Sequence, residues 1–357
     1  MLFDSILRGK NFFLTGATGT LGVPLVRKLL ESGARAVFCL VRGKDPEARL
    51  RRIFGDDKRI AAISGDISLP KAGVSQQLIR ALVISNHYFI HAAADISFDP
   101  TKQAHIEKIN IHGTQNAYEL SKSIGSDKFV LVSSAYANEK GANAYERSKA
   151  AAEKFIIDQG GDYLIVSPGV IVGDPDTGEI VKFESYYGLL RVLWKIKQRV
   201  EKSNRLGLEF NKEGDLILPI RIPCSDVSCL NLVSNRWVAE MICTLIAQRK
   251  SRQKYYLINS RPPKTKWLFE VSLPLLGITG FNFNGHQVNE SLQTVIEGQL
   301  RPYLRYIQKG INDNISDERL VASLSRALGS SFYPDVEMNK ETVGRLLAYA
   351  KDNNFGL

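Results

Sequence analysis

The segment from Phe12 to Gly22, FFLTGATGTLG, constrains the fold more than any other part of the chain. Residues 12–14 predict a buried parallel strand, residues 15–20 a tight turn, and residues 21–30 an amphipathic helix. Its three glycines have the spacing of a dinucleotide-binding loop: one permits the turn, one lets a pyrophosphate approach the backbone, and one lets the helix pack on the strand. The free N–H groups at the start of the helix would bind the anion. The residues expected to line this loop are Gly16, Thr18, Gly19, Thr20, Leu21 and Gly22.

Length and composition allow one large domain or two of moderate size. The chain has 357 residues, of which 44% are apolar, enough to bury a substantial core. No run of 18 apolar residues occurs, so we expect no transmembrane span. The first residues, MLFDSILRGK, include an early acidic residue and no long apolar stretch, which indicates neither a secretory leader nor a transit peptide.

The four cysteines indicate a reducing environment. Cys224 and Cys229 lie five residues apart without neighbouring histidines, and Cys39 and Cys243 stand alone. This pattern favours reduced thiols over metal ligands or disulfides. We therefore expect a cytoplasmic protein without a metal site.

Apolar runs recur along the first half of the chain at the spacing of an alternating α/β fold. Residues 36–41, 60–63, 88–91 and 129–132 each predict a buried strand, and a long helix around Asn110 is expected to end near Ser123. Strands that alternate with helices predict a doubly wound parallel (Rossmann) sheet, whose ligands bind beyond the carboxyl ends of the strands. The candidate ligand-binding residues lie at such ends.

The ends of the second and third strands indicate which nucleotide binds. In dinucleotide folds, an acidic residue after the second strand binds the free 2′-hydroxyl of the adenosine ribose, whereas a basic residue accommodates a 2′-phosphate. Arg42 occupies that place with Lys44 close by, which favours NADPH over NADH; the alternative is that both are solvated loop charges. After the third strand, Asp66 would form a hydrogen bond with an adenine ring and Ile67 would pack against it.

Small residues follow the fourth strand. Ala92, Ala93 and Ala94 would let a cofactor lie against the backbone. His91, just before them, is expected to be a packed or capping histidine. Asn110 is a further cofactor-site residue and can tie neighbouring strands together.

A tyrosine, a lysine and a serine pair form the chemical constellation. Tyr145 and Lys149 project from one face of a predicted helix over residues 145–153. A phenol that titrates near 10 is a poor acid or base at neutral pH, and a nearby ammonium favours the phenolate and lowers its pKa. At the end of the fifth strand, we expect Ser134 to hold a substrate oxygen where negative charge develops. Ser133 is expected to contact the cofactor or the strand end.

Together these motifs resemble those of the extended short-chain dehydrogenases/reductases. Further short sequence segments resemble the fatty acyl-CoA reductase and thioester reductase branch of that group. The resemblance covers residues 6–175 closely and continues loosely to about 260. It implies Ser134, Tyr145 and Lys149 as catalytic residues, with Tyr145 and Lys149 also at the cofactor. Two positions depart from the branch: Thr20 replaces a usual aromatic residue, and Ser167 replaces a frequent arginine. The resemblance adds Pro168, Gly169 and Val170 to the cofactor site. The segments that carry the resemblance are Gly9–Asn11, Leu40–Lys44 followed by Ala48–Leu50, His91–Ala93 with Phe98 and Asp99, Asn110 with Gly113 and Thr114, and Val132–Tyr136.

The resemblance implies an NADPH-dependent reductase of an acyl thioester in lipid or polyketide metabolism. The thiol would be coenzyme A or an acyl carrier protein, and the product an aldehyde or, after a second hydride, an alcohol. Two alternatives stay open. A nucleotide-sugar epimerase or dehydratase of the same fold uses the same three side chains but keeps its cofactor bound, and a non-catalytic NADP-binding regulator typically lacks the tyrosine and lysine.

The second half predicts a mainly helical substrate-binding region over 176–357, after an NADP-binding domain over 1–175 whose last strands extend to about 260. The net charge of +10 favours an anionic partner, which charge alone does not identify. The basic amphipathic helix 186–200 would meet an acidic carrier protein or the surface of a membrane, or is an ordinary surface helix; no nucleic-acid partner is expected. Further expected elements are a helix over 230–247, a strand over 255–259, a helix and loop over 262–287 that form an apolar substrate wall, and a helical cap that includes 301–306, 321–328 and 340–353.

Overall fold

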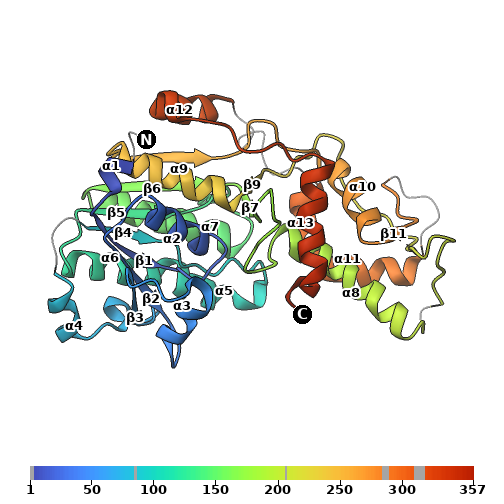
Figure 1. Cartoon of the computed structure of the whole chain (residues 1–357). Coiled ribbons are helices and arrows are strands. Elements are labelled where there is room, and N and C mark those ends of the chain that lie inside the picture. The colour runs from blue at the N-terminus through green and yellow to red at the C-terminus, as the bar shows by residue number, and fades with distance from the viewer. Residues whose placement is uncertain (1–3, 84–86, 206, 284–288, 309–317) are drawn as a thin grey trace. The chain divides into compact units, whose positions relative to one another are not determined.

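The computed structural model describes residues 4–83, 87–205, 207–283, 289–308 and 318–357 (Figure 1). The chain divides into two compact units. The first unit comprises Met1–Ile171, Asn235–Ile258 and Glu318–Tyr333, and the second comprises Val172–Ser234, Asn259–Asp317 and Pro334–Leu357. The end of the predicted helix and loop over 262–287 falls partly on residues 284–288, outside the described residues.

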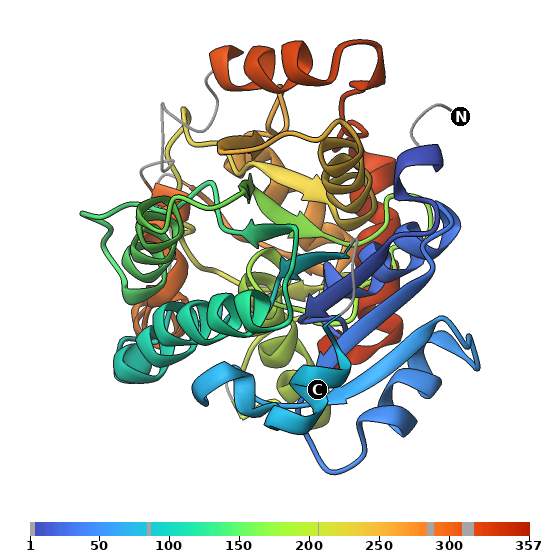
Figure 2. The same cartoon turned by 90° about the vertical axis from the view of Figure 1, so that its left-hand side faces the viewer.

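A seven-stranded parallel sheet forms the centre of the first unit (Figure 2). Its strand order is β10, β6, β5, β4, β1, β2, β3, so the direction of winding reverses between β1 and β4. This order confirms the predicted doubly wound fold. The strands are β1 (Asn11–Thr15), β2 (Ala36–Val41), β3 (Ile60–Ser64), β4 (His87–His91), β5 (Lys128–Val132), β6 (Tyr163–Pro168) and β10 (Gln253–Leu257).

Sequence analysis located most of these strands to within two residues and overlooked one. The predicted turn over 15–20 begins one residue later, because Thr15 still pairs with Leu40 of β2 and His91 of β4. The strand expected over 255–259 is β10, which begins two residues earlier and ends at Leu257. The overlooked strand is β6. Its apolar part is short, and Ser167 and Pro168 follow it at the end of the strand.

Helices cover both faces of the sheet. On one face α2 (Gly22–Glu31) packs against α9 (Asn235–Ala247), and on the other α6 (Gly113–Ser123) packs beside α7 (Ala144–Asp158). Asn143 begins α7, because its side chain accepts a hydrogen bond from Glu146 N. The other helices of this unit are α1 (Asp4–Leu7), α3 (Pro46–Phe54), α4 (Gln76–Ala81), α5 (Gln103–Glu107) and α12 (Glu318–Leu328).

The helix predicted over 230–247 is shorter than expected. Residues Leu232–Ser234 form the short strand β9, and α9 begins only at Asn235. The carboxylate of Asp335 accepts hydrogen bonds from the N–H and the hydroxyl of Ser234, at 2.5 and 2.7 Å. These bonds hold the chain extended up to that residue.

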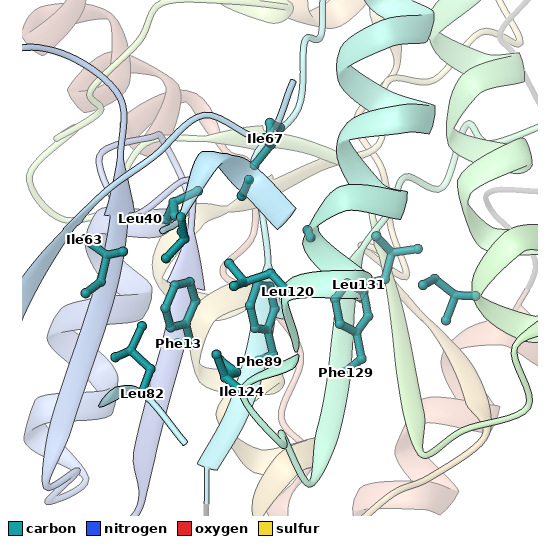
Figure 3. Packing of buried hydrophobic residues seen from close by; sticks show 14 of the residues in the cluster. Phe13, Leu40, Ile63, Ile67, Leu82, Phe89, Leu120, Ile124, Phe129 and Leu131 are labelled. Carbon is teal, nitrogen blue, oxygen red and sulfur yellow. The ribbon is translucent and has the colours of Figure 1, made fainter. Parts of the chain in front are cut away.

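A row of aromatic rings fills the core between the sheet and α6 (Figure 3). Phe13 stacks on Phe89 at a centroid distance of 4.8 Å, and Phe89 stacks on Phe129 at 5.4 Å. The rings come from β1, β4 and β5, and Leu120 and Ile124 of α6 belong to the same buried cluster. The core therefore fixes the three strands whose carboxyl ends carry the candidate site.

The second unit is mainly helical, and it does not include Asn235–Ile258 or Glu318–Tyr333, which belong to the first unit. Its helices are α8 (Tyr186–Lys202), α10 (Thr265–Leu275), α11 (Glu290–Gln308) and α13 (Lys340–Asp352), and β8 (Leu216–Ile217) pairs with β11 (Ile278–Thr279). Trp194 and Gln198 of α8 both donate hydrogen bonds to the side chain of Asn354. Beside it, the buried ring of Phe355 packs against Trp194 and Phe183. The end of the chain is thereby fixed against α8.

The described residues contain neither a membrane-spanning helix nor a cluster of metal-binding side chains. Among them, no helix has the length and apolarity needed to span a bilayer. The same part of the chain contains no group of three or more His, Cys, Asp or Glu side chains placed to hold a metal ion. All four cysteines are free thiols.

Truncating the central ring of the core should destabilise the first unit strongly. We expect Phe89→Ala to lower the free energy of unfolding by about 3 to 5 kcal/mol, because it removes a fully buried ring and leaves a cavity. Denaturant unfolding followed by circular dichroism measures this loss. Ile157→Ala is the control, because that side chain is 47% exposed and its loss should cost no more than about 0.5 kcal/mol. Equal losses for the two variants would contradict this description of the core.

Candidate active site

The glycine loop lies directly against the chain that follows β4. Gly16 has a φ of +77°, and a Cβ atom there would lie 2.7 Å from Ala93 N. At Gly22, a Cβ atom would lie 2.0 Å from Gly16 O. A side chain at Gly16 would push the loop away from the chain after β4, and a side chain at Gly22 would clash with Gly16 and Ala17 inside the loop. Sequence analysis placed both glycines in one site with Ala92 and Ala93, and the structure brings them together.

The loop fits a pyrophosphate. Thr18, Gly19 and Thr20 stay partly exposed, whereas Gly22 is buried in the first turn of α2. No side chain caps that helix at Leu21. Val23 N donates to Gly19 O, Leu25 N donates to Leu21 O, and Pro24 has no N–H, so the helix offers an anion its positive end rather than a row of free donors. The loop therefore retains the accessible backbone and the positive helix end that a dinucleotide needs.

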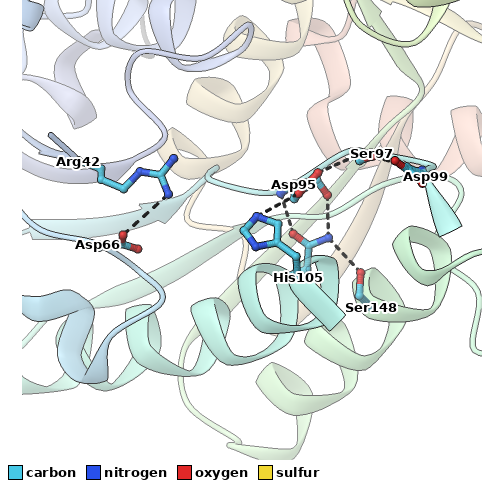
Figure 4. Close-up of polar contacts among 8 residues, drawn as sticks. Arg42, Asp66, Asp95, Ser97, Asp99, His105 and Ser148 are labelled. Carbon is cyan, nitrogen blue, oxygen red and sulfur yellow. Dashed lines mark hydrogen bonds and ion pairs between the residues drawn. The ribbon is translucent and has the colours of Figure 1, made fainter. Parts of the chain in front are cut away.

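The ends of β2 and β3 bring opposite charges together (Figure 4). Arg42 Nη1 lies 3.8 Å from Asp66 Oδ2, and the Arg42 side chain is 72% exposed. Burial opposes ionisation of Asp66, but hydrogen bonds from Ser68 and the charges of Arg42 and Lys108 together hold its pKa below the usual range. Lys44 is exposed beyond the same strand. The guanidinium is thus held beside a carboxylate while most of its surface remains free.

Ile67 lies in the hydrophobic core. Its side chain is 9% exposed and belongs to the cluster between the sheet and α6. A Cβ atom at Gly113 would lie 3.0 Å from the Ile67 side chain, so the two residues are in close contact. At this strand end Asp66 is therefore the more accessible of the two predicted adenine contacts.

Ala92, Ala93 and Ala94 follow β4, and all three are partly exposed. Ala93 N donates a hydrogen bond to Thr15 Oγ1 at 3.2 Å, which fixes this segment to the end of β1. His91 is buried, and its Nδ1 lies 2.7 Å from the same hydroxyl. Burial and the charge of Lys149 lower the pKa of His91 to about 3. His91 is therefore a neutral, packed residue at physiological pH.

Asn110 joins the segment after β4 to α7 through Asp95 and Ser148, the two partners that Figure 4 labels. It lies in a π-helical turn (Lys108–His112) between α5 and α6, a distortion often found at functional sites. Its Oδ1 accepts from Asp95 N at 2.8 Å, and its Nδ2 donates to Asp95 O at 2.9 Å and to Ser148 Oγ at 3.0 Å. The expectation that Asn110 ties two strands together needs correction, because its partners are a loop and a helix.

Ser134 and Tyr145 form a hydrogen-bonded pair. The phenol ring meets Phe98 edge to face at 5.7 Å, and Ser134 Oγ accepts a hydrogen bond from Tyr136 N at 3.1 Å. Burial raises the pKa of Tyr145 to about 12, although the bond to Ser134 acts in the opposite direction. The predicted lowering of this pKa by Lys149 is therefore wrong for the structure as it stands, because desolvation outweighs the favourable contacts.

Lys149 lies one turn further along α7, and its ammonium is buried. Its Nζ donates to Val132 O at 2.9 Å, at the end of β5. Desolvation lowers the pKa of Lys149 to about 8, and the charge of Glu153 opposes that shift. The structure thus places Lys149 beside the same strand end that leads into Ser133 and Ser134.

The segment around Pro168 adjoins the serines. Pro168 O accepts a hydrogen bond from Ala135 N at 2.8 Å, and Gly169 N donates to Leu257 O at 3.0 Å. Gly169 and Val170 are partly exposed beyond the end of β6. All the sequence-predicted site residues thus follow strands of this one sheet or belong to α2, α7 and the π-helical turn between α5 and α6.

A buried charged group that was not predicted from the sequence lies beside the site. Ser133 Oγ donates to Glu153 Oε1 at 2.5 Å, and Lys254 of β10 lies 2.7 Å from Glu153 Oε2. The signal was available, because Glu153 follows Lys149 by one helical turn. The contribution of Lys254 was not readable, since only the fold brings β10 beside β6.

The chain is similar to two curated reductases over about half its length. It is 30% identical to "Fatty acyl-CoA reductase wat" of Drosophila melanogaster over 207 residues, which cover 49% of this chain and 38% of that protein. It is 33% identical to "Ceramide reductase" of Caulobacter vibrioides (strain NA1000 / CB15N) over 171 residues, which cover 48% of this chain and 49% of that protein. The matches thus span less than half of each relative.

A solved structure shares the fold over nearly the whole chain. It is the terminal R domain from the myxalamid PKS-NRPS biosynthetic pathway, with a TM-score of 0.75 at 18% identity. The likeness covers 98% of this chain and 92% of that one, which confirms the fold.

A family match covers the glycine loop, the serine pair and the tyrosine and lysine. The sequence matches the family described as Male sterility protein, a group of NAD-binding domains, over residues 14–143 and 138–210. This is more than half of the chain, and it spans every part of the candidate site. Together with the sheet order and the geometry of the glycine loop, it shows that the chain belongs to the Male sterility protein family within the extended short-chain dehydrogenases/reductases.

Proposed function

We propose that this chain is an NADPH-dependent reductase of acyl thioesters. The observation that carries the proposal is the hydrogen-bonded pair of Ser134 and Tyr145 with Lys149 on the next turn of α7. Ser134 and Tyr145 both follow β5, which lies next to β4 in the sheet. The chain after β4 in turn meets the glycine loop. The family and the fatty acyl-CoA reductase relative support the same activity.

The bound cofactor would supply a hydride to the acyl carbonyl carbon. Ser134 and Tyr145 would donate hydrogen bonds to the carbonyl oxygen, where negative charge develops. Tyr145 is a phenol at neutral pH and can also give up its proton to that oxygen. Collapse of the resulting hemithioacetal would release a thiol and an aldehyde, and a second round would yield an alcohol.

Residues of the first unit would hold the cofactor. The loop from Gly16 to Gly22 would bind the pyrophosphate, with the segment from Ala92 to Ala94 and the residues after Pro168 beside it. Arg42 and Lys44 would meet a 2′-phosphate, and Asp66 the adenine. Lys149 would orient the ribose, and Ser133 would support the strand end.

The second unit would bind the acyl chain and its carrier. Its basic helix α8 turns its apolar side inward, with Leu189, Leu190 and Leu193 buried. Lys195 and Arg199 remain exposed on this helix and would meet coenzyme A phosphates or an acidic carrier protein.

The experiment that tests the proposal is incubation with NADPH and a panel of acyl-CoA and acyl carrier protein thioesters. Loss of absorbance at the wavelength of the reduced nicotinamide should accompany release of free thiol. A ceramide belongs in the panel, because the second relative is described as a ceramide reductase. Nucleotide sugars test the epimerase alternative, which would give a changed sugar without net loss of NADPH.

Removing the phenol should stop turnover and spare cofactor binding. We expect Tyr145→Phe to lower kcat by at least about 100-fold, which is the usual contribution of a general acid, because the variant lacks the proton-donating hydroxyl. Cofactor binding should be spared, because the ring contact with Phe98 is kept. Initial rates and fluorescence titration with NADPH measure the two effects. Tyr118→Phe, a change on α6, should leave both unaffected. Full turnover by Tyr145→Phe would refute the assigned role.

Arg42 should determine the preference for the phosphorylated cofactor. We expect Arg42→Ala to weaken NADPH binding about 10-fold or more and to leave NADH binding nearly unchanged, since only the 2′-phosphate is charged there. Parallel titrations with both nucleotides measure the ratio. Arg80→Ala, which removes an exposed arginine of α4, is the matched control. Equal weakening for both nucleotides would count against a 2′-phosphate site.

The activity should fall in alkaline solution as Lys149 loses its proton. Its pKa of about 8 lies below the ordinary 10.5, so the ammonium is present below pH 8 and is lost as the pH rises through that value. We therefore expect kcat/KM to decline above about pH 8. In Lys149→Arg the guanidinium stays charged, so this decline should disappear, whatever the absolute rate. An identical decline in the variant would assign it to another group.

A further inference from the structure

Glu153 places a carboxylate inside the first unit, on the face of α7 that also carries Lys149. The residue is 8% exposed and lies four positions after the lysine, so the two side chains are neighbours on the helix surface. A buried carboxylate is costly unless it is paired and hydrogen-bonded. Its partners therefore indicate what it does.

Both carboxylate oxygens have partners, and those partners come from three different strand ends. Oε1 accepts hydrogen bonds from Ser133 Oγ at 2.5 Å, after β5, and from Ser167 Oγ at 3.3 Å, in β6. Oε2 lies 2.7 Å from Lys254 Nζ of β10, and that ammonium also sits 4.7 Å from the centre of the Tyr256 ring. One side chain thus joins α7 to three neighbouring strands.

Stability alone does not explain this arrangement. A buried ion pair is often no more stabilising than apolar residues of similar volume. The position of Ser133 suggests a more specific role, because it directly precedes Ser134, the partner of Tyr145. Glu153 therefore acts on the serine side of the site through one bond.

The same carboxylate also acts on the lysine side of the site. It is the charged group that favours the ammonium form of Lys149, against the opposing effect of burial. The other groups around this lysine are neutral near pH 7: His91 of β4 titrates at about 3 and Tyr145 at about 12. Lys254 is the cation on the far side of Glu153, and it offsets part of the negative charge.

We propose that Glu153 is a positioning residue: it holds Ser133 at the end of β5 and acts on Lys149 one turn away on α7, with Lys254 of β10 as its counter-charge. The effect of Glu153 on catalysis rests on the proposed reductase function. The effect of Glu153 on Lys149 is independent of that function and can be measured without any substrate.

The test is a pH titration of Lys149 by NMR, in protein labelled with ¹³C at lysine Cε. The Lys149 signal is identified by its absence in Lys149→Arg. We expect Glu153→Gln to lower the titration midpoint by about one pH unit, because it removes a nearby negative charge. Lys254→Gln should raise the midpoint by about half a unit, because it removes a positive charge from beyond the carboxylate.

A matched control separates charge from general loosening of the fold. Lys128→Gln removes another buried lysine, at the opposite end of β5, where it pairs with Asp162 at 3.3 Å. It should leave the Lys149 midpoint unchanged. Shifts of opposite sign in the two test variants support the proposal, since loss of packing alone would not change the midpoint in both directions.

Two results would overturn the proposal: an unchanged midpoint in Glu153→Gln, or shifts in the same direction in Glu153→Gln and Lys254→Gln. If Glu153→Gln does not fold, the absence of an upward shift in Lys254→Gln is sufficient to reject it. Activity assays on the same variants separate the two hypotheses. If the midpoints shift as expected but no thioester is reduced, the reductase function fails and the charge assignment stands.

Discussion

The candidate site depends on keeping one lysine charged where there is little water. Lys149 is 6% exposed, and its ammonium is held by a main-chain carbonyl at the end of β5. Desolvation disfavours that charge, and the fold offsets it with a buried carboxylate one turn away on α7. Burial outweighs the carboxylate, so the pKa of Lys149 is lowered to about 8.

A second constraint is steric and fixes where a nucleotide would lie. The glycine loop and the chain after β4 approach so closely that Gly16 leaves no room for a side chain, and Gly22 packs just as tightly against Gly16 and Ala17 within the loop. The threonine hydroxyl at the end of β1 secures the same junction through Ala93 and His91. The junction where the strand order reverses is therefore shaped by main-chain packing, while the proposed catalytic residues lie after β5 and on α7.

Local patterns in the sequence predicted much of the fold and of the site. The apolar runs located β1 to β5, and the spacing of Tyr145 and Lys149 placed both on one helix, beside the strand end that carries Ser134. What failed depended on contacts between distant segments. The start of α9 depends on Asp335, about a hundred residues further on, and the pairing of Glu153 with Lys254 requires β10 to lie beside β6. The pKa of Tyr145 was predicted in the wrong direction because burial, which no pattern of residues reports, outweighs the effect of the hydrogen bond with Ser134.

In the proposed reaction, a hydride passes from a bound nicotinamide to an activated acyl carbon beside Tyr145. The most direct measurement is the mass of the product formed from an acyl thioester and NADPH that carries deuterium at the transferred position. The account predicts an aldehyde with one deuterium per molecule, or an alcohol with two. Product without deuterium, or deuterium found only in recovered cofactor while substrate is still consumed, would contradict it.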